Sequence, residues 1–68
     1  MQVIDYFETD ELSAELLSPT DGETMPFVLR KVYPDGRETI ELWGKRPEVE
    51  LARFQRLKRA LGAASFGT

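Results

Sequence analysis

Three arginines near the end of the chain stand at intervals of three residues, as Arg53, Arg56 and Arg59, with Lys58 beside them. Residues three and four apart share one side of a helix, so a helix here would present these cations together. Guanidinium groups suit carboxylate and phosphate groups, which makes an acidic protein or a nucleic acid the partner for such a face. The alternative interpretation is a solvated helix face, because cations near a helix C-terminus stabilise the helix and a charged surface keeps a small domain in solution.

A second candidate site comes from the aromatic residues of segment 27–43. If this segment forms a hairpin, both of its faces carry apolar side chains. We assign the helix to the face that carries Val28, Val32, Ile40 and Leu42. The other face carries the protein-binding candidates Phe27, Leu29, Trp43 and Tyr33, among Lys31 and Glu41. Either the N-terminal segment covers Trp43, or the aromatic patch is exposed and binds a partner or a second copy of the chain.

The first part of the chain supplies a third group of residues, the carboxylates. Residues 1–29 hold seven acids and no basic residue, whereas residues 30–68 hold all nine basic residues and five acids. The leading acids are Asp5, Glu8, Asp10, Glu11 and Glu15. Their spacing is not that of a calcium-binding loop. We expect them to be solvated or to pair with the basic helix inside the same fold.

Catalysis has little chemical basis in this sequence. Histidine and cysteine are both absent, which removes the commonest general base, the thiol nucleophile and the usual zinc ligands. A domain of this size also rarely encloses the roughly 300 Å³ that a small-molecule site needs. We therefore expect no enzymatic activity, no cofactor and no metal.

These candidate sites depend on a hairpin, for which the sequence signal is strong. In Tyr33-Pro34-Asp35-Gly36-Arg37, proline presets the turn and glycine accepts the positive φ of a bulge. The predicted arms are residues 27–33 and 37–43. A type I turn with a glycine bulge places Val32 opposite Glu38, Arg30 opposite Ile40, and Phe27 opposite Trp43.

The N-terminal part is harder to assign. Residues 3–7 read as a strand, and the stretch from Pro19 to Met25 resembles the later turn in its Asp-Gly and Glu-Thr pairs, which suggests a meander. Residues 11–17 alternate polar and apolar as a strand does, but Leu12 and Leu16 are also four apart, as in a short helix. Both interpretations stay open.

The last element is a helix from about Pro47 to Leu61. Proline suits its first position, Glu48 and Glu50 suit the positive end of its dipole, and Gly62 closes its far end. At 100° per residue its apolar side chains form one stripe, which should cover the sheet. That stripe consists of Leu51, Phe54, Leu57 and Leu61.

The sequence therefore predicts an α+β fold, an antiparallel meander of three to four strands with one C-terminal helix packed on a sheet face. Residues 1–61 form the single domain and residues 62–68 a flexible tail. A chain of 68 residues has a marginal core, which favours a protein partner or a homo-oligomer. The expected function is a small non-enzymatic interaction or regulatory module, of the kind found as bacterial or phage accessory proteins. The alternative is a nucleic-acid-associated module that uses the basic face supported by Arg30, Lys31, Lys45 and Arg46. With no signal peptide or membrane-span pattern, we expect a cytoplasmic protein.

Overall fold

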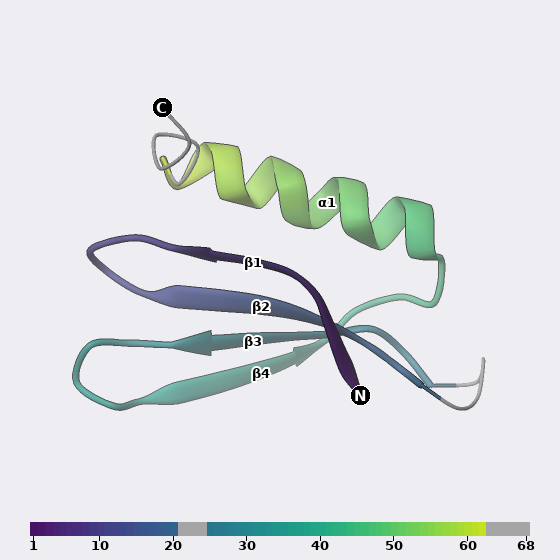
Figure 1. The fold of residues 1–68 in the computed structure, drawn as a ribbon, viewed down its shortest axis with the longest axis horizontal. Coiled ribbons are helices and arrows are strands. Elements are labelled where there is room, and N and C mark those ends of the chain that lie inside the picture. Colours follow the sequence, from purple (N-terminus) through teal and green to yellow (C-terminus); the bar gives the residue numbers. More distant parts are fainter. Residues whose placement is uncertain (21–24, 63–68) are drawn as a thin grey trace.

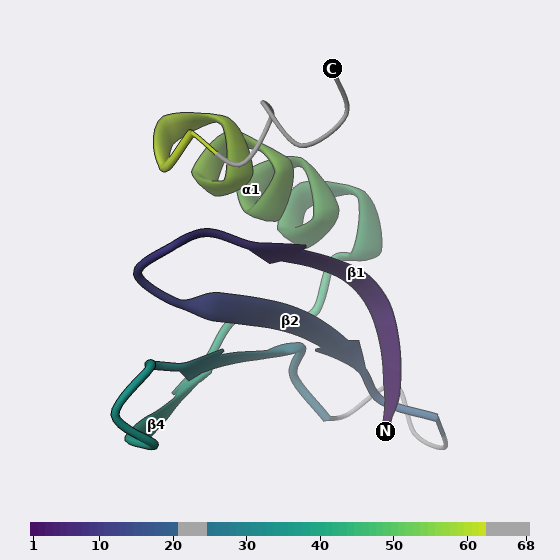
Figure 2. The same ribbon diagram turned by 60° about the vertical axis from the view of Figure 1, so that its left-hand side comes forward.

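The computed structural model describes residues 1–20 and 25–62, which form four strands and one helix. The strands are β1 (Gln2–Glu8), β2 (Ser13–Ser18), β3 (Val28–Val32) and β4 (Glu38–Leu42), and the helix is α1 (Pro47–Ala60). All neighbouring strands pair antiparallel in the order β1-β2-β3-β4, so the sheet is an open meander with α1 along one face (Figures 1 and 2). The predicted α+β meander is confirmed.

The predicted hairpin is also confirmed in its turn and in its register. Gly36 has a φ of +93°, and its N–H donates to the carbonyl of Tyr33 at 2.9 Å. Val32 pairs with Glu38 and Arg30 with Ile40. The ladder continues past the strand ends, because the N–H of Trp43 donates to the carbonyl of Phe27 at 2.8 Å.

The ambiguous segment 11–17 forms a strand for most of its length, as β2. Leu12 and Leu16 do not follow one another around a helix. Instead, Leu16 lies opposite Leu29 in the sheet, and Leu12 closes the preceding turn by accepting a 2.8 Å hydrogen bond from the N–H of Thr9. The second proposed turn falls largely on residues 21–24, and the proposed tail on residues 63–68, which lie outside the described residues.

The helix begins at Pro47, as expected, and ends at Ala60. Leu61 is the C-cap, and Gly62 follows with a φ of +81°, which is the role predicted for it. Of the predicted stripe, Phe54 is fully buried, and Leu51 and Leu57 pack beside it. Leu61 is 42% exposed, so its place in the core was wrong, because the helix has already ended there.

The assignment of the helix to a sheet face was wrong. The helix covers the face that carries Leu29 and Trp43, and the fully buried Phe54 lies against Phe7 and Trp43, with ring centroids 5.3 and 6.4 Å apart. The face that carries Ile40 and Leu42 is left uncovered. The core consists of Phe7, Ala14, Leu16, Phe27, Leu29, Trp43 and Phe54.

Candidate functional site

The basic face and the aromatic patch, which the sequence treats as separate sites, meet at one place in the structure. The guanidinium of Arg53 lies over the indole of Trp43, with its Cζ 4.1 Å from the ring centroid. Arg53 is therefore held on the β4 side of α1 by a cation–π contact. The predicted basic face and the predicted aromatic patch therefore meet at the contact between Arg53 and Trp43.

Beside this contact lies a hollow of about 340 Å³ between α1 and the β3–β4 hairpin. It exists because α1 makes its closest approach to β1 and covers the far side of the sheet less completely. It is a groove open to solvent and not an enclosed cavity. We call it the basic groove, and it is lined by Leu29, Lys31, Glu41, Trp43, Arg53, Arg56, Leu57 and Ala60.

The charges around the basic groove are unequal, with three cations and one acid. The carboxylate of Glu41 is already engaged, because the indole N–H of Trp43 donates to it at 3.2 Å and Lys31 Nζ lies 3.3 Å from its other oxygen. Arg56 is exposed and forms no ion pair within the described part of the chain. The basic groove therefore presents excess positive charge above an apolar floor.

The pKa of Glu41 lies below its ordinary value. The largest cause is the hydrogen bond from Trp43, followed by the one from Lys31, and the positive charges of Lys31 and Arg53 add to them. Burial opposes the shift by disfavouring the charged carboxylate. All of these groups line the basic groove, so a measured pKa of Glu41 would report the positive potential inside that groove.

We expect replacement of Trp43 by phenylalanine to raise the pKa of Glu41, because the ring stays but the donor is lost. The carboxyl carbon resonance of Glu41, followed by NMR between neutral and acidic pH, measures it. A depressed folded-state pKa adds stability above the unfolded-state pKa, and this stability is lost as the pH falls through the folded-state value. The Phe variant should therefore lose less stability on acidification, and an unchanged Glu41 midpoint would contradict the assigned cause.

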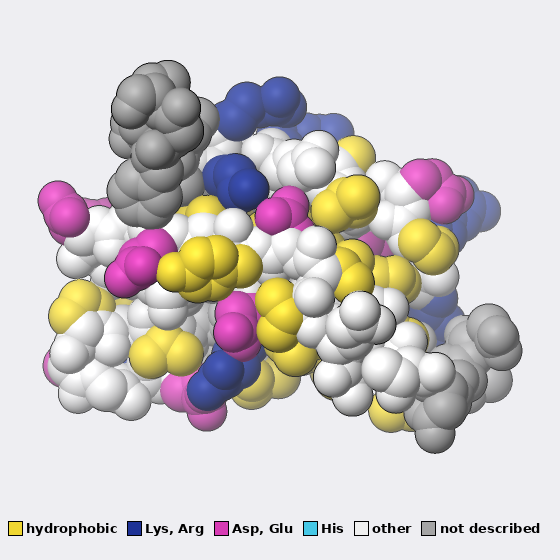
Figure 3. All heavy atoms as spheres, in the orientation of Figure 1, with side chains coloured by type: hydrophobic (Ala, Val, Ile, Leu, Met, Phe, Trp, Pro, Cys, Tyr) yellow, Lys and Arg dark blue, Asp and Glu magenta, His cyan; other side chains and the backbone are white. Residues whose placement is uncertain are grey.

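The predicted basic face is divided between the two flanks of α1. Lys58 points to the opposite side from Arg53, where its Nζ lies 3.2 Å from a carboxylate oxygen of Asp5 on β1. Arg59 is exposed, without an ion pair among the described residues. Lysine and arginine gather over the outer side of α1 (Figure 3). Lys58 therefore connects α1 to β1. The three arginines of the predicted basic face lie at the basic groove or in solvent.

The expected pairing of the acidic segment with the helix occurs at one point in residues 1–20 and 25–62, the Asp5–Lys58 contact. Glu15 instead pairs with Arg30 of the neighbouring strand at 2.9 Å. The three helix arginines make no ion pair with the described acids. Of the leading acids that the structure describes, only Asp5 and Glu15 thus pair with cations of the later part of the chain.

The aromatic patch does not form an exposed surface. Phe27 and Leu29 are 5% and 1% exposed, and Trp43 is 8% exposed. Tyr33 lies apart from them at the hairpin turn, where the guanidinium of Arg37 stacks 4.9 Å above its ring. The patch is therefore not the exposed surface that the sequence allows for, because α1 covers this face, although Leu29 and Trp43 still line the basic groove.

Leu57 and Ala60 are the residues of the basic groove that the sequence does not point to as site residues. Lys31 and Glu41, which also line the groove, lie on the same sheet face as Trp43, and the hairpin register predicts this. The arginines come close to them only because α1 packs on that face. No group of three or more metal-binding side chains occurs among the described residues. No helix within them has the length and apolarity needed to cross a bilayer.

No protein-family model matches this chain, and the comparisons with curated proteins and with solved structures found no similar protein.

Proposed function

We propose that this chain is a small, non-enzymatic interaction module of the cytoplasm that binds an acidic segment of a partner protein in the basic groove. The observation that carries the proposal is the arrangement of Lys31, Arg53 and Arg56 around an accessible apolar floor. A site of this kind can bind one apolar side chain of the partner while carboxylates on either side meet the cations.

The arginines favour carboxylates as the partner groups. A guanidinium can donate two parallel hydrogen bonds to one carboxylate, and such charged hydrogen bonds contribute about 1.5–3 kcal/mol. Arg56 is free for this among the described contacts, and Arg53 is already oriented by the indole of Trp43. Glu41 does not repel an incoming acid strongly, because Lys31 lies beside it.

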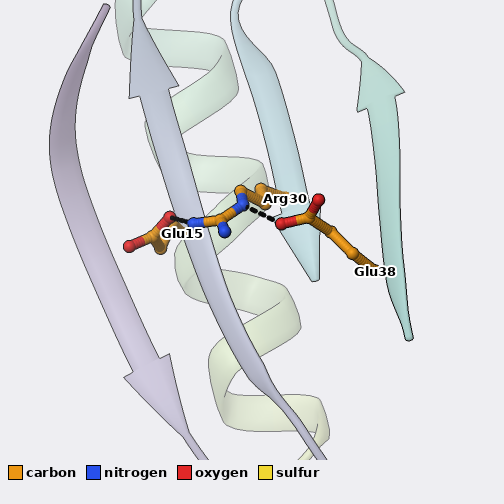
Figure 4. A network of polar contacts seen from close by, with 3 residues as sticks. All are labelled: Glu15, Arg30 and Glu38. Atoms are coloured by element: carbon orange, nitrogen blue, oxygen red, sulfur yellow. Dashed lines mark hydrogen bonds and ion pairs between the residues drawn. The ribbon is translucent and has the colours of Figure 1, made fainter. Parts of the chain in front are cut away.

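The alternative function, nucleic-acid binding, has weaker support from the geometry. It needs a continuous basic track, and Arg30 was proposed as part of it. Arg30 instead lies on the sheet face away from α1, where it pairs with Glu15 and Glu38 (Figure 4). Of the other predicted cations, Lys31, Arg53 and Arg56 line the short basic groove, whereas Lys45 lines a different hollow and Arg46 is the N-cap of α1. A short groove suits a peptide segment better than a phosphate backbone, which needs a longer track of cations.

The only tryptophan of the chain lies in the basic groove, so its fluorescence can report binding. The test is a titration at low salt with a synthetic peptide in which aspartates and glutamates flank one leucine. A peptide with lysines in place of the acids is the control ligand. We expect the acidic peptide alone to bind, and Arg56→Glu to weaken it by about tenfold or more, which corresponds to about 1.4 kcal/mol.

The matched variant is Arg46→Glu, which makes the same change of charge at the exposed N-cap of α1, outside the basic groove. We expect it to leave the affinity for the acidic peptide nearly unchanged. Equal losses in both variants would reveal attraction by net charge without a site. A response to single-stranded DNA and none to the acidic peptide would replace this proposal with the nucleic-acid alternative, and no response to either would refute both.

A further inference from the structure

Strand β4 forms an edge of the sheet that has no protecting feature among the described residues. The other edge, β1, has a register irregularity between Val3 and Asp5, and α1 makes its closest approach to this strand (Figure 2). β4 has a regular register, contains no proline or lysine, and all five of its residues are exposed. Bulges, prolines, lysines and covering helices are the usual protection of a sheet edge, so β4 is the edge to which a further strand can add.

The hairpin register places the backbone groups of this edge. In an antiparallel ladder, alternate residues direct both N–H and C=O to the neighbouring strand, and the residues between them direct theirs away. The N–H of Tyr33 donates to the carbonyl of Arg37 at 2.9 Å. The N–H of Trp43 donates to that of Phe27 at 2.8 Å, so the odd-numbered residues from 37 to 43 face β3. The residues of β4 whose backbone groups point away from β3, and bond to no other group in the described part of the chain, are Glu38, Ile40 and Leu42.

The two sides of β4 present different chemistry to an added strand. On the side of α1, Glu41 and Trp43 line the basic groove, and the guanidinium of Arg53 reaches over the indole. On the other side, Ile40 and Leu42 are 55% and 72% exposed. Directly opposed residues of neighbouring strands have Cβ atoms about 4.5–5.5 Å apart, so the side chains of an added strand would contact both sides.

We propose that an extended segment of the partner protein adds to β4 as an antiparallel fifth strand. This rests on the function proposed above, and it specifies the conformation and sequence pattern of the acidic segment. Every second side chain of a strand faces the same side, so the acid, the apolar residue and the second acid at the basic groove stand two positions apart. The two residues between them face Ile40 and Leu42, where β-branched apolar side chains fit. The sequence Glu-Val-Leu-Val-Glu has this pattern.

Charge favours an acidic segment over a second copy of β4. Glu38 pairs with Arg30 of the neighbouring strand. Glu41 pairs with Lys31 of the same strand, so both carboxylates of this edge are already engaged. An incoming acid meets Arg56, which has no ion pair with the described acids. A second copy paired through the same edge would bring its own basic groove to the same side of the sheet, and cations would meet cations.

Methylation of the peptide backbone tests the added strand. In an antiparallel pair, the peptide residues opposite Ile40 and Leu42 direct their N–H groups to β4, and their neighbours direct theirs away. In Glu-Val-Leu-Val-Glu, blocked at both ends, the first set is the two valines. We expect methyl groups on both valine nitrogens to weaken binding by more than about tenfold. Methyl groups on the nitrogens of the leucine and the last glutamate should change it little. Tryptophan fluorescence measures both affinities.

These peptides separate the added strand from the proposed function. Equal effects of the two methylation patterns, with affinity still lost in Arg56→Glu, refute the added strand and leave the proposed function standing. The same conclusion follows if this peptide fails to bind while the acidic peptide of the earlier titration binds. If neither peptide binds, both proposals are refuted.

A variant of β4 tests the same edge from the side of the protein. Ile40→Pro removes an N–H that points away from β3, and proline is tolerated on the outer side of an edge strand. The matched variant is Ile40→Thr, which loses the apolar side chain and keeps the N–H. We expect Ile40→Pro to bind the peptide more than about tenfold more weakly than Ile40→Thr, with circular dichroism showing that both are folded. Equal affinities of the two folded variants contradict the added strand.

Amide hydrogen exchange, followed by NMR, locates the bound segment. Saturating peptide should slow the exchange of Ile40 by more than about tenfold and leave Thr39, whose N–H is directed to β3, nearly unchanged. No slowing at Ile40 overturns the proposal. Slowing that grows with protein concentration in the absence of peptide would show a second copy at this edge, and this result also overturns it.

Discussion

Phe54→Ala is expected to unfold the chain at 25 °C. The ring is fully buried between Phe7 of β1 and Trp43, which follows β4. Its removal therefore leaves a cavity where the helix contacts residues from both edges of the sheet. Truncating a buried phenylalanine to alanine costs about 3–5 kcal/mol. A domain below about 70–80 residues rarely gains more than about 3–5 kcal/mol from its single core. The loss therefore equals the whole stability.

Far-ultraviolet circular dichroism and urea titration measure this effect. The matched control is Leu61→Ala, which truncates another apolar residue at the end of the same helix. Leu61 is 42% exposed, so we expect it to change the free energy of unfolding by no more than about 0.5 kcal/mol. Comparable losses in the two variants would mean that the helix does not pack through Phe54 as described.

Trp43→Ala is expected to have the second-largest effect, about 3–5 kcal/mol. Its indole packs edge-on against Phe54, supports Arg53 and donates to Glu41. Trp43→Phe keeps an aromatic ring in this position and loses mainly the N–H donor and some volume. We expect the Phe variant to stay folded with a smaller loss of stability, of about 1–2 kcal/mol.

Urea unfolding followed by circular dichroism distinguishes the two, since both variants lack the fluorescent indole. This experiment also decides whether Trp43 is a core residue or a surface anchor. A surface anchor would tolerate alanine with its stability unchanged. A folded Trp43→Ala chain with the stability of wild type would therefore contradict the buried position of the indole.

The local part of this fold could be predicted from the sequence, because each signal is contained in a few neighbouring residues. Pro34 and Gly36 specify the turn, and the turn fixes the register of β3 and β4. Pro47 and Gly62 mark the helix to within one residue of its observed end. None of these features depends on distant contacts.

The choice of the covered face could not be predicted in this way. Both faces of the hairpin are partly apolar, and a period of two does not say which of them is inside. The decisive residues are Ala14 and Leu16 of β2, which are fully buried opposite Lys31 and Leu29. Because residues 11–17 also fitted a helix, the sequence did not show which of their side chains share a sheet face with Leu29 and Trp43. The basic groove was missed for the same reason, since it forms only when α1 lies on the face of Trp43.

The nearest-neighbour order of the strands has a consequence for how the chain reaches this structure. Every strand pairs with the next one in sequence, so the sheet can grow by closing short loops, among them the four-residue turn from Thr9 to Leu12 and the five-residue turn from Tyr33 to Arg37. Phe54 behaves differently, because it needs Phe7 from the first strand and Trp43 from beyond the last. Packing of the helix onto the sheet therefore connects β1 at one edge with the residue that follows β4 at the other edge. This step makes folding all-or-none. The basic groove is complete only in molecules that have passed this step.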